Sequence, residues 1–494
     1  MSNPPAISVL IPWCERDELR LTLAANAPAF RAHEADVLVL NCGGNSGHLR
    51  ELIAASETSG VRQLDISAPR FNKALALNVG LLYSRSDTVL ILDADVVLLS
   101  DFLEEAKALA DGKSFVTIER VYESEQTVPL NSQPPGVADN FTVTLLTSAA
   151  IEFRFRDGTA VQHQLSRRDM FRNMRAGPGL LLAQKCDLLE IQGFNSELET
   201  WGWEDDDVLV RLQYARKLRR IQNGAALHLT HGDDRRVLRT SRNQSDQINF
   251  IKCCRNYNNG LFLGTYRSDV AGIADKVTEK RTDDLDPQPA DAVVRCSGGH
   301  TPSFLFGPTF CGDENGMLRE NSWDSSNVPY SIDQLLLAAT VERFPLESQD
   351  VLCVGVRSSG LATRLSSCSR NVTTVTPERI EPSEAGTCHN VISNKYRAAF
   401  REYLPLNVYD IIIDNNIASY ACCQRHLKTL MENYSKLLAP AGRLLTTQWG
   451  MDWSASDSCW KLSDADLAFL ASEYGLCVTK TGYGVYTLKS RTTA

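Results

Sequence analysis

The sequence predicts an α/β protein with two domains, each built on a mostly parallel sheet with helices on both faces. Short apolar runs alternate with helical periodicity between residues 7 and 95, which is the pattern of such sheets. The same alternation begins again near Asn327, after a stretch rich in charge, Gly and Pro. We therefore expect an N-terminal domain over residues 1–268, a linker or irregular subdomain over 269–326, and a Rossmann-type domain over 327–494.

The elements of the first domain follow from local patterns. Strands are predicted at Ile7–Ile11, which Pro12 ends, at Asp36–Leu40, which the turn-like NCGGNSG ends, and at Thr88–Leu92. Helical spacing covers Arg16–Phe30 and residues 72–84. Ligands of these sheets bind beyond the carboxyl ends of the strands. The segments expected near a ligand are therefore Pro12–Arg16, Asn41–Asn45 and Asp93–Asp95.

The second domain shows the same alternation over its whole length. Its predicted helices are Ser331–Phe344, Leu361–Ser367 and Cys423–Leu438, the last of which Pro440-Ala441-Gly442 stops. Its predicted strands are Asp350–Val356, Asn371–Val375, Tyr409–Ile413 and Arg443–Thr447, with further strand signal in Leu476–Leu488.

Length, charge and cysteine usage exclude several classes of protein. A chain of 494 residues with a net charge of -9 is large enough for several cores and is unlike a general nucleic-acid or anionic-membrane binder. No apolar run approaches the roughly 20 residues that span a bilayer, and no signal peptide is visible. The 14 cysteines include no C-x-x-C pair with a matching partner pair. We therefore expect reduced thiols in a cytoplasmic protein, with neither a disulfide framework nor a structural zinc site.

The first chemical motif is Asp93-Ala94-Asp95, directly after a buried strand. Two carboxylates in alternation share a face if the strand stays regular, and part if the chain turns there. In both cases one can reach a metal while the other holds a sugar or the backbone. The alternative is an ordinary strand-end turn, in which Asp is common.

The second motif is His228-Leu229-Thr230-His231, followed by Gly232-Asp233-Asp234. Histidines three apart can chelate one ion on a turned or helical backbone, but face apart on a regular strand. Mn²⁺, Co²⁺ and Zn²⁺ accept mixed imidazole and carboxylate ligands. The alternative is one packed and one exposed histidine, although the chain has only 8 histidines in all.

The third motif is Trp201-Gly202-Trp203-Glu204-Asp205-Asp206-Asp207. Consecutive acids suit the first turn of a helix, where they meet the positive end of the dipole. Capping does not explain the two tryptophans beside them. An aromatic ring can stack on the apolar face of a sugar while an acid binds or deprotonates a hydroxyl. A glycosidase also uses paired carboxylates, but it needs neither Asp-x-Asp nor a histidine metal site.

Taken in order over residues 5–250, the motifs resemble the GT-A fold glycosyltransferases, most of all the beta-1,4-galactosyltransferase group (glycosyltransferase family 7-like, with family 2). Ile11-Pro12-Trp13-Cys14-Glu15-Arg16 is similar to I-P-F-R-N-R, and Val39-Leu40-Asn41 to V-I-N. Phe71-Asn72-Lys73-Ala74 with Leu77-Asn78-Val79-Gly80 is similar to F-N-R-A…L-N-V-G. Asp93–Asp95 is similar to the D-x-D, and Gly193-Phe194 with residues 201–207 resembles G-F…W-G-W-G-G-E-D-D-D.

The resemblance implies a role for each matching residue. The nucleotide-sugar donor, a UDP-sugar in this group, would contact Pro12, Arg16, Asn41, Phe71, Lys73, Asp93 and Trp203. A divalent ion, which the resemblance implies is Mn²⁺, would be held by Asp95, His228 and His231. Glu204, Asp205 and Asp206 would line the sugar and acceptor site, with Asp205 as the base.

The chain departs from the family pattern at three places. Cys14 replaces an arginine that touches the nucleotide. Lys73 replaces an arginine, which removes a bidentate fork. The glycine pair before the acids is missing, so the alignment leaves Asp205 and Asp206 both open as the base. Arg175 and Gly177-Pro178-Gly179 could shape the acceptor side, and loop packing explains them equally well.

These roles imply a metal-dependent, inverting hexosyltransferase that moves a sugar from a nucleotide diphosphate to a hydroxyl of a glycan, metabolite or protein. The metal neutralises charge on the leaving group, and the carboxylate removes the hydroxyl proton. One alternative is a bifunctional enzyme that also methylates the same glycan. Another is a carbohydrate-binding scaffold without catalysis.

The methylating alternative comes from the second domain, which resembles the class I S-adenosylmethionine methyltransferases. Val351–Gly355 with Arg357–Gly360 is similar to their first motif, and Tyr409–Ile413 and Leu437–Leu444 to later ones. Cys353 takes the place of the strand acid, Arg357 obstructs the glycine turn, and Glu378 is the candidate for holding the ribose. We expect an inactive methyltransferase-like domain ahead of an active one that binds S-adenosylmethionine.

Overall fold

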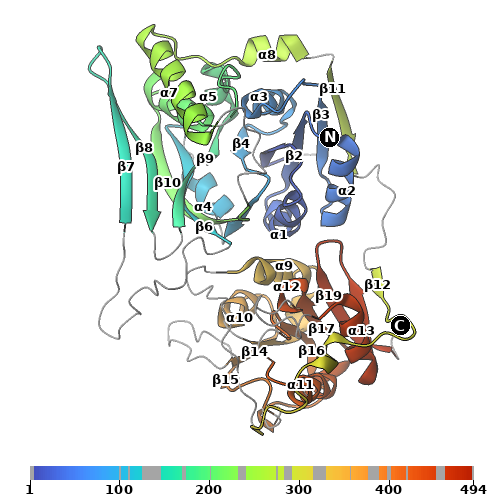
Figure 1. The fold of residues 1–494 in the computed structure, drawn as a ribbon. Coiled ribbons are helices and arrows are strands. Elements are labelled where there is room, and N and C mark those ends of the chain that lie inside the picture. Colours follow the sequence, from blue (N-terminus) through green and yellow to red (C-terminus); the bar gives the residue numbers. More distant parts are fainter. Residues whose placement is uncertain are drawn as a thin grey trace, which may run out of the picture. The chain divides into compact units, whose positions relative to one another are not determined.

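The structure is a computed structural model of the 494-residue chain. It divides into two compact units, Met1–Gln288 and Pro289–Ala494, and each is described by itself (Figure 1). The structure describes residues 5–99, 102–109, 112–124, 146–169, 174–200, 202–231, 241–273, 276–282, 292–314, 330–355, 358–376, 389–397, 402–418, 421–451 and 462–491.

The first unit is built on one mixed sheet of eleven strands. Nine of them follow the order β11-β3-β2-β1-β4-β9-β6-β10-β5, while β8 pairs with β9 and β7 with β8. The strands are β1 Ile7–Trp13, β2 Ala35–Cys42, β3 Arg62–Ile66, β4 Thr88–Ile91, β5 Val96–Leu99, β6 Ser114–Glu123, β7 Leu146–Arg154, β8 Ala160–Asp169, β9 Met174–Gln184, β10 Arg219–His228 and β11 Val277–Arg281.

The predicted parallel arrangement holds only for part of this sheet. Strands β3, β2, β1 and β4 are parallel neighbours, as the alternation of strands and helices requires. Strand β9 then runs antiparallel between β4 and β6, and β5 and β11 are antiparallel to their neighbours as well. Carboxyl ends of strands therefore gather at β1 and β4, which is where a ligand is expected.

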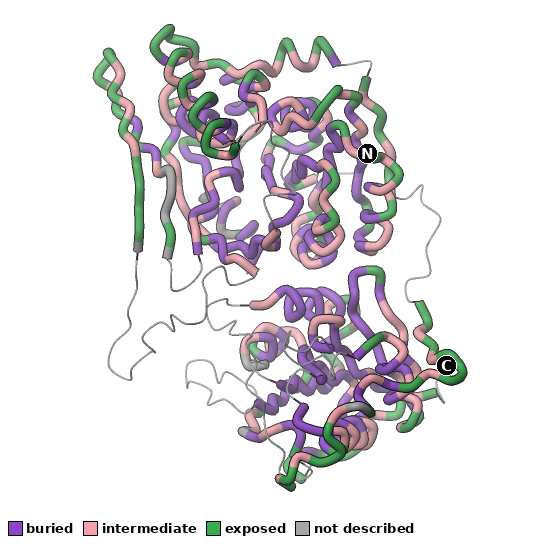
Figure 2. Tube along the Cα trace, in the orientation of Figure 1, coloured by how far each residue is buried: buried purple, intermediate pink, exposed green. Residues whose placement is uncertain are grey.

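Helices cover both faces of this sheet. They are α1 Leu19–Ala32, α2 Ser46–Ser56, α3 Lys73–Tyr83, α4 Phe102–Leu109, α5 Lys185–Glu190, α6 Glu204–Ala215, α7 Arg242–Asn258 and α8 Tyr266–Ile273. Alternate residues of β1 belong to different cores: Val9 packs with α1, α2 and α4, and Leu10 packs with α3, α5 and α6. Figure 2 shows the resulting buried strands between half-exposed helices.

Two features of the first domain differ from the sequence prediction. Pro12 does not end the first strand, because β1 continues to Trp13. Its pairing with β4 stops at Leu10, so beyond that point β1 is paired only with β2 and a residue without an N–H is tolerated. Helix α2 and strand β3 were not predicted, although Asn45 caps α2 by accepting from the N–H groups of Gly47 and His48.

The second unit is an eight-stranded sheet in the order β12-β18-β19-β17-β16-β13-β14-β15. The run β15-β14-β13-β16-β17 is parallel and has the Rossmann order 3-2-1-4-5. Its strands are β12 Ala292–Val294, β13 Asp350–Val354, β14 Asn371–Thr376, β15 His389–Ile392, β16 Tyr409–Asp414, β17 Leu438–Thr447, β18 Leu476–Lys480 and β19 Val485–Ser490. This topology confirms the predicted fold class for the second half.

Helices also line both sides of the second sheet. They are α9 Ile332–Val341, α10 Ser358–Ser366, α11 Gln424–Leu437, α12 Gln448–Met451 and α13 Asp464–Glu473. Apolar residues of α11 and α13 form one core with Leu352, Val354 and Ile412 of the sheet. Helix α10 packs on β13 and β14. Pro440-Ala441-Gly442 was expected to lie between helix and strand, but lies within β17, where the register with β16 shifts.

The stretch expected to be a linker contributes to both sheets instead. Strand β11 adds an antiparallel edge to β3 in the first unit, and β12 adds one to β18 in the second. Polar edge strands of this kind carry little apolar periodicity, which explains why composition suggested a linker. A short 3₁₀ turn at Ser303–Phe306 follows, with Phe304 fully buried in the core of the second unit.

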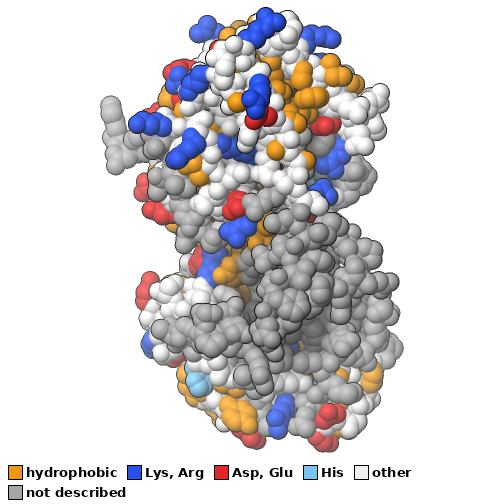
Figure 3. All heavy atoms as spheres, turned by 90° about the vertical axis from the view of Figure 1, so that its left-hand side faces the viewer, with side chains coloured by type: hydrophobic (Ala, Val, Ile, Leu, Met, Phe, Trp, Pro, Cys, Tyr) orange, Lys and Arg blue, Asp and Glu red, His pale blue; other side chains and the backbone are white. Residues whose placement is uncertain are grey.

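Among the helices in the described ranges, none is both long and apolar enough to cross a membrane. The twelve described cysteines are all outside disulfides. Large exposed hydrophobic side chains include Ile248 and Ile251 of α7 and Leu261 and Leu263 after it. Figure 3 shows orange side chains gathered on the upper part of the first unit.

Candidate active site

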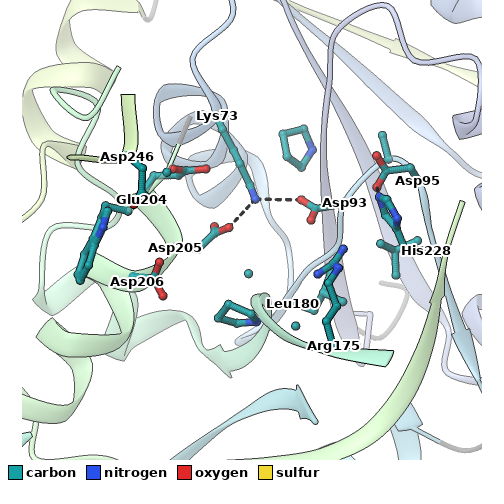
Figure 4. A pocket seen from close by; sticks show the side chains of 18 of the residues that line it. Lys73, Asp93, Asp95, Arg175, Leu180, Glu204, Asp205, Asp206, His228 and Asp246 are labelled. Carbon is teal, nitrogen blue, oxygen red and sulfur yellow. Dashed lines mark hydrogen bonds and ion pairs between the residues drawn. The ribbon is translucent and has the colours of Figure 1, made fainter. Parts of the chain in front are cut away.

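A cavity of about 760 Å³ lies in the first unit beyond the carboxyl ends of β1 and β4. Most residues predicted to form a site line it: Pro12, Arg16, Phe71, Lys73, Asp93, Asp95, Trp203, Glu204, Asp205, Asp206 and His228. They come from segments up to about two hundred residues apart along the chain, and Figure 4 shows them converging on one space. Asn41 and His231 are not in its lining.

The two carboxylates of Asp93-Ala94-Asp95 point to different partners. Strand β4 ends at Ile91 and β5 begins at Val96, so the motif occupies a tight turn between them. Asp93 faces Lys73 in the cavity, whereas Asp95 faces His228 (Figure 4). Asp95 also contacts His231. Of the two arrangements the sequence allowed, the structure therefore has the one in which the carboxylates part.

Asp95 and the two histidines form a compact donor set. Asp95 Oδ2 lies 3.1 Å from His231 Nε2, and Asp95 Oδ1 lies 3.7 Å from His228 Nε2. Strand β10 ends at His228, and the chain turns after it, so both imidazoles reach the same carboxylate. One ligand atom from each of the three residues lies within 4.8 Å of the others. This is the arrangement in which a carboxylate and two imidazoles can share one divalent ion.

Glu123 at the end of β6 orients His228. Its Oε2 lies 2.6 Å from His228 Nδ1, which leaves Nε2 directed at Asp95. Burial alone would lower the pKa of His228, but the neighbouring carboxylates of Asp95 and Glu123 raise it to about 9. Burial would raise the pKa of Asp95, and the bonds from His228 and His231 outweigh it and hold that pKa well below its usual range. Asp95, Glu123 and His228 thus form a cluster of opposite charges.

Lys73 joins the two sides of the cavity. Its Nζ lies 2.9 Å from Asp93 Oδ1 and 2.9 Å from Asp205 Oδ2, as the dashed lines in Figure 4 show. It is the first residue of α3, whose N-cap Asn72 accepts from the N–H of Leu75. Desolvation opposes its charge, but Asp205 and Asp93 raise the pKa of Lys73 well above its usual value. The ammonium is therefore permanently charged between two carboxylates.

The acids of the third motif form the first turn of α6, as the sequence predicted. Trp203 is the N-cap in a left-handed conformation with φ 68°, and no side chain caps the helix. Glu204 is 8% exposed, and its Oε2 is buried and finds no hydrogen-bond partner within the described part of the chain. Burial and the neighbouring Asp205 charge raise the pKa of Glu204 to about 8. Burial also raises the pKa of Asp205, although Lys73 opposes that shift.

The two later acids are bound by protein groups. Asp206 Oδ1 lies 2.6 Å from Nε2 of His163, a fully buried residue of β8. Asp207 accepts from Arg211 Nε at 2.8 Å and from the Tyr257 hydroxyl at 2.9 Å, and Asp207 and Arg211 are both at least 98% buried. Asp207 therefore links α6 to α7 and does not reach the cavity.

Two glycines allow the close approach of backbone and carboxylate in this site. At Gly179 in β9, a Cβ would overlap the carboxylate of Asp205. At Gly202, with φ 98°, a Cβ would overlap the carboxylate of Asp246. Trp203, which follows Gly202, is 5% exposed, and its ring centroid lies 4.6 Å from that of Phe250, so only part of its ring faces the cavity. Gly177-Pro178-Gly179 is thus part of a strand that lines the site, not a loop turn.

The nucleotide-side residues differ in their surroundings. Arg16 lines the cavity, and its Nη1 is buried without a hydrogen-bond partner among the described residues. Asn41 is 3% exposed and uses its amide on Gly44 and on Asp65 Oδ1 at 2.8 Å. The side chain of Asn41 therefore shapes the loop after β2 and does not face the cavity.

Several lining residues carried no sequence signal. Arg242, Asn243 and Asp246 come from the first turns of α7, whose polar sequence resembles any solvated helix. His163 and Glu123, which contact lining residues, lie within strands, where a lone polar residue indicates no function. Arg175, which the sequence did single out, lines the site and pairs with Glu123 at 2.9 Å. Trp201 and Gly232-Asp233-Asp234, which the motifs included, lie outside the described residues.

Comparison with known proteins bears on this same region. Residues 162–231 match the family model described as the N-terminal domain of galactosyltransferase. The matched segment runs from β8 through α6 to His231, and so contains the acids of α6 and both histidines. The match confirms the resemblance predicted from the sequence and, over this segment, the prediction of a glycosyltransferase. No curated protein matches the chain.

Solved structures similar to parts of the chain fall into two groups. S. aureus TarS 1-349 in complex with UDP-GlcNAc is 15% identical, with a TM-score of 0.32, over 51% of this chain and 72% of that one. The same TarS fragment without that ligand is 17% identical, with a TM-score of 0.30, over 50% and 71%. Burkholderia thailandensis 1,6-didemethyltoxoflavin-N1-methyltransferase, with its bound ligand and S-adenosylhomocysteine, is 16% identical, with a TM-score of 0.24, over 32% and 76%.

Proposed function

We propose that the protein is a metal-dependent, inverting glycosyltransferase that transfers a sugar from a nucleotide-diphosphate donor to a hydroxyl of a glycan, metabolite or protein. One observation carries the proposal: Asp95 and His228, two of the three metal-type donors, line the same cavity as the carboxylates of α6 and lie opposite them. A UDP-sugar is the donor that the family resemblance implies. The charges suit this reaction, because its leaving group is anionic and its acceptor must lose a proton.

The metal would be held by Asp95, His228 and His231. The fit is supported by the donor chemistry, one carboxylate and two imidazoles within 4.8 Å, and by Glu123, which orients His228 from behind. A bound Mn²⁺ or similar ion supplies Lewis-acid neutralisation of the donor's diphosphate. The three residues hold their donor atoms in place before the donor arrives, which reduces the reorganisation needed on binding.

The donor would lie along the segments after β1 and before α3. Arg16 offers a buried guanidinium nitrogen that no described residue engages, which suits a phosphate oxygen. Phe71 and Pro12 provide apolar surface in the lining. Lys73 stands where the resemblance places a phosphate-binding arginine, and its charge is assured by Asp93 and Asp205.

Asp205 is the group we assign as the base. Its carboxylate faces the cavity and contacts Lys73, whereas Asp206 is engaged by the buried His163. Burial raises the pKa of Asp205, which makes it a stronger base than an exposed aspartate. In this assignment the acceptor hydroxyl gives its proton to Asp205, its oxygen attacks the anomeric carbon, and the bond to the diphosphate breaks on the opposite side. The configuration of the sugar is thereby inverted.

The test is donor turnover. Nucleotide sugars are first screened by thermal shift with and without Mn²⁺, and hydrolysis or transfer is then followed for the donor that binds. We expect Asp95→Ala to abolish Mn²⁺-dependent turnover. Asp205→Asn should reduce transfer by about 10²-fold or more while donor affinity persists. Loss in Asp206→Asn with an active Asp205→Asn moves the base by one residue. Sugar binding without any turnover in the wild type supports the non-catalytic scaffold.

The second unit fits S-adenosylmethionine poorly at the residues described. Its ligand edge would be the carboxyl ends of β13 and β16. There Lys395 Nζ is buried and donates to both oxygens of Asp414 at 2.9 Å, and Tyr434 donates to Asp414 at 2.7 Å. A Cβ at Gly355 would overlap the side chain of Asn416. Arg357 and Glu378 lie outside the described residues. We therefore propose a structural role for this unit, and saturable binding of S-adenosylmethionine would contradict it.

A further inference from the structure

Four soft metal-ligand side chains converge in the second unit, and none of them belongs to the site described above. They are Cys311, Cys422, Cys423 and His426, and one ligand atom from each lies within 4.8 Å of the others. Cys423 is the N-cap of α11, and His426 lies in its first turn. Cys311 arrives from the irregular segment that follows the 3₁₀ turn at Ser303–Phe306. A structural zinc site was not expected from the sequence, because the cysteines include no C-x-x-C pair with a matching partner pair.

The distances match a tetrahedral ion. The three sulfur atoms lie 3.5, 3.4 and 3.0 Å from His426 Nδ1, in the order Cys311, Cys422 and Cys423. With Zn–S near 2.3 Å and Zn–N near 2.0–2.1 Å, tetrahedral sulfur and nitrogen ligands stand about 3.5 Å apart. Only a small movement of Cys423 would bring all three sulfurs to that separation.

One imidazole nitrogen cannot serve all three thiols as a hydrogen-bond acceptor. A neutral imidazole nitrogen has one lone pair, so His426 Nδ1 can accept from one thiol and not from three, and the thiol of Cys311 also donates to the backbone oxygen of Asp313 at 3.4 Å. His426 Nε2 lies 3.3 Å from the backbone oxygen of Glu314, which fixes the ring with Nδ1 as the free acceptor. Cys422, Cys423 and His426 are each at least 98% buried, so water is not the common partner. A cation that binds all four groups resolves the arrangement.

We infer that Cys311, Cys422, Cys423 and His426 form a structural zinc site that fastens the 307–314 segment to the start of α11. Three thiolates and one imidazole make a closed tetrahedral set without an open position, which is the pattern of structural zinc. His426 and Cys311 are 115 positions apart in the sequence, so an ion bound to both closes a long loop.

The surroundings show what the ion would hold. The first-turn N–H groups of Gln424 and Arg425 donate to the backbone oxygens of Pro308 and Thr309. The Gln424 side chain donates to the backbone oxygens of Leu305 and Gly307. Of the described residues that follow Phe304 in this segment, none belongs to the apolar core. The segment is thus tied to the first turn of α11 by polar contacts, and a metal would add a cross-link that apolar burial of the segment does not supply.

The test is metal analysis of the full chain purified under reducing conditions and washed with a chelator. We expect one zinc ion per chain to survive the wash. After replacement by Co²⁺, we expect a thiolate-to-cobalt charge-transfer band, which the Asp95 and histidine set cannot give. Cys423→Ser and His426→Gln should reduce zinc retention by about tenfold or more. Cys368→Ser, which keeps the bond to the Leu365 oxygen, should change nothing.

The outcomes separate this proposal from its rivals. Absence of both zinc and the cobalt band in the wild type overturns it, as does a non-reduced mass showing that two of these cysteines form a disulfide. If Cys423→Ser does not fold, Cys311→Ser in the irregular segment provides the same measurement outside the helix. Donor turnover should persist in Cys311→Ser, because every residue assigned to that reaction lies in the first unit. The two proposals therefore fail independently.

Discussion

The ammonium of Lys73 lies 2.9 Å from the carboxylate of Asp205, the residue assigned as the base. A cation at this distance holds the carboxylate ionised and in a fixed position, but it also competes with the acceptor proton. The donor's phosphates offer Lys73 a stronger partner than Asp205. Donor binding would thus release the base just when it is needed.

Substitution of Lys73 tests this coupling. Lys73→Met should weaken donor binding by about tenfold or more, because it removes a phosphate contact and leaves Asp93 and Asp205 to repel each other. Lys73→Arg should retain activity, because the family pattern has arginine there. Calorimetric donor affinities of the two variants give the comparison. Equal affinity in Lys73→Met and the wild type would show that the lysine only joins the two acids.

Glu204 should make stability depend on pH. Its pKa of about 8 in the folded protein exceeds its ordinary value of 4.5, so the folded state keeps a proton that the unfolded chain releases. Stability should therefore fall as pH rises from about 4.5 to about 8, by at most about 1.4 kcal/mol per pH unit, and level off above. Glu204→Gln should flatten this decline in urea titrations, whereas the exposed Glu51→Gln should not. An unchanged slope in Glu204→Gln would place the proton elsewhere.

Substitution of His231 tests the assigned metal ligands separately from the carboxylates assigned to catalysis. It does not line the cavity but bonds to Asp95, so its loss should weaken Mn²⁺ and leave the donor's own contacts intact. We expect His231→Ala to need about 10–100-fold more Mn²⁺ for half-maximal turnover. His33→Ala, at the end of α1, serves as the control. A Mn²⁺ titration that coincides with the wild type would remove His231 from the ligand set.

Asp207 should prove structural although it belongs to the acidic run. Its pair with Arg211 is buried, so Asp207→Asn leaves an uncompensated guanidinium and should cost about 3–5 kcal/mol of unfolding free energy. The matched control is Glu432→Gln in the exposed i,i+4 pair with Lys436, where less than about 1 kcal/mol is expected. Turnover per folded molecule should be unchanged in Asp207→Asn. A selective loss of turnover would return Asp207 to the catalytic group.

Local signals predicted the site's own elements well. The helix beginning at Glu204, the helix at Lys73 and the strand ending before Asp93 all depend on short-range periodicity and capping. The sequence allowed either a regular strand or a turn at Asp93–Asp95, and only the turn separates the two carboxylates. The acids can occupy the first turn of α6 and still reach the cavity, because one helical turn directs Glu204 and Asp205 toward the cavity and Asp207 toward α7.

Partners that arrive from elsewhere in the chain could not be predicted. His163 reaches Asp206 only through the pairing of β8 with β9, and Cys311 reaches His426 across more than one hundred residues. Asn41 shows the opposite case: its motif matches the family, yet its amide is used within its own loop. Spacing along a chain predicts which residues share a helix or strand, and long-range contacts need the packed structure.

The edge strand β11 decides where the protein can be divided into halves. A fragment ending at residue 268 would lose β11 and expose the open edge of β3, which invites pairing with another molecule. It would also remove Glu279, one of two acids that hold the buried guanidinium of Arg62. A fragment ending after Thr282 keeps both. Separate expression of the two halves should therefore cut between Thr282 and Ala292, and a shorter fragment that precipitates says nothing about whether the first half folds alone.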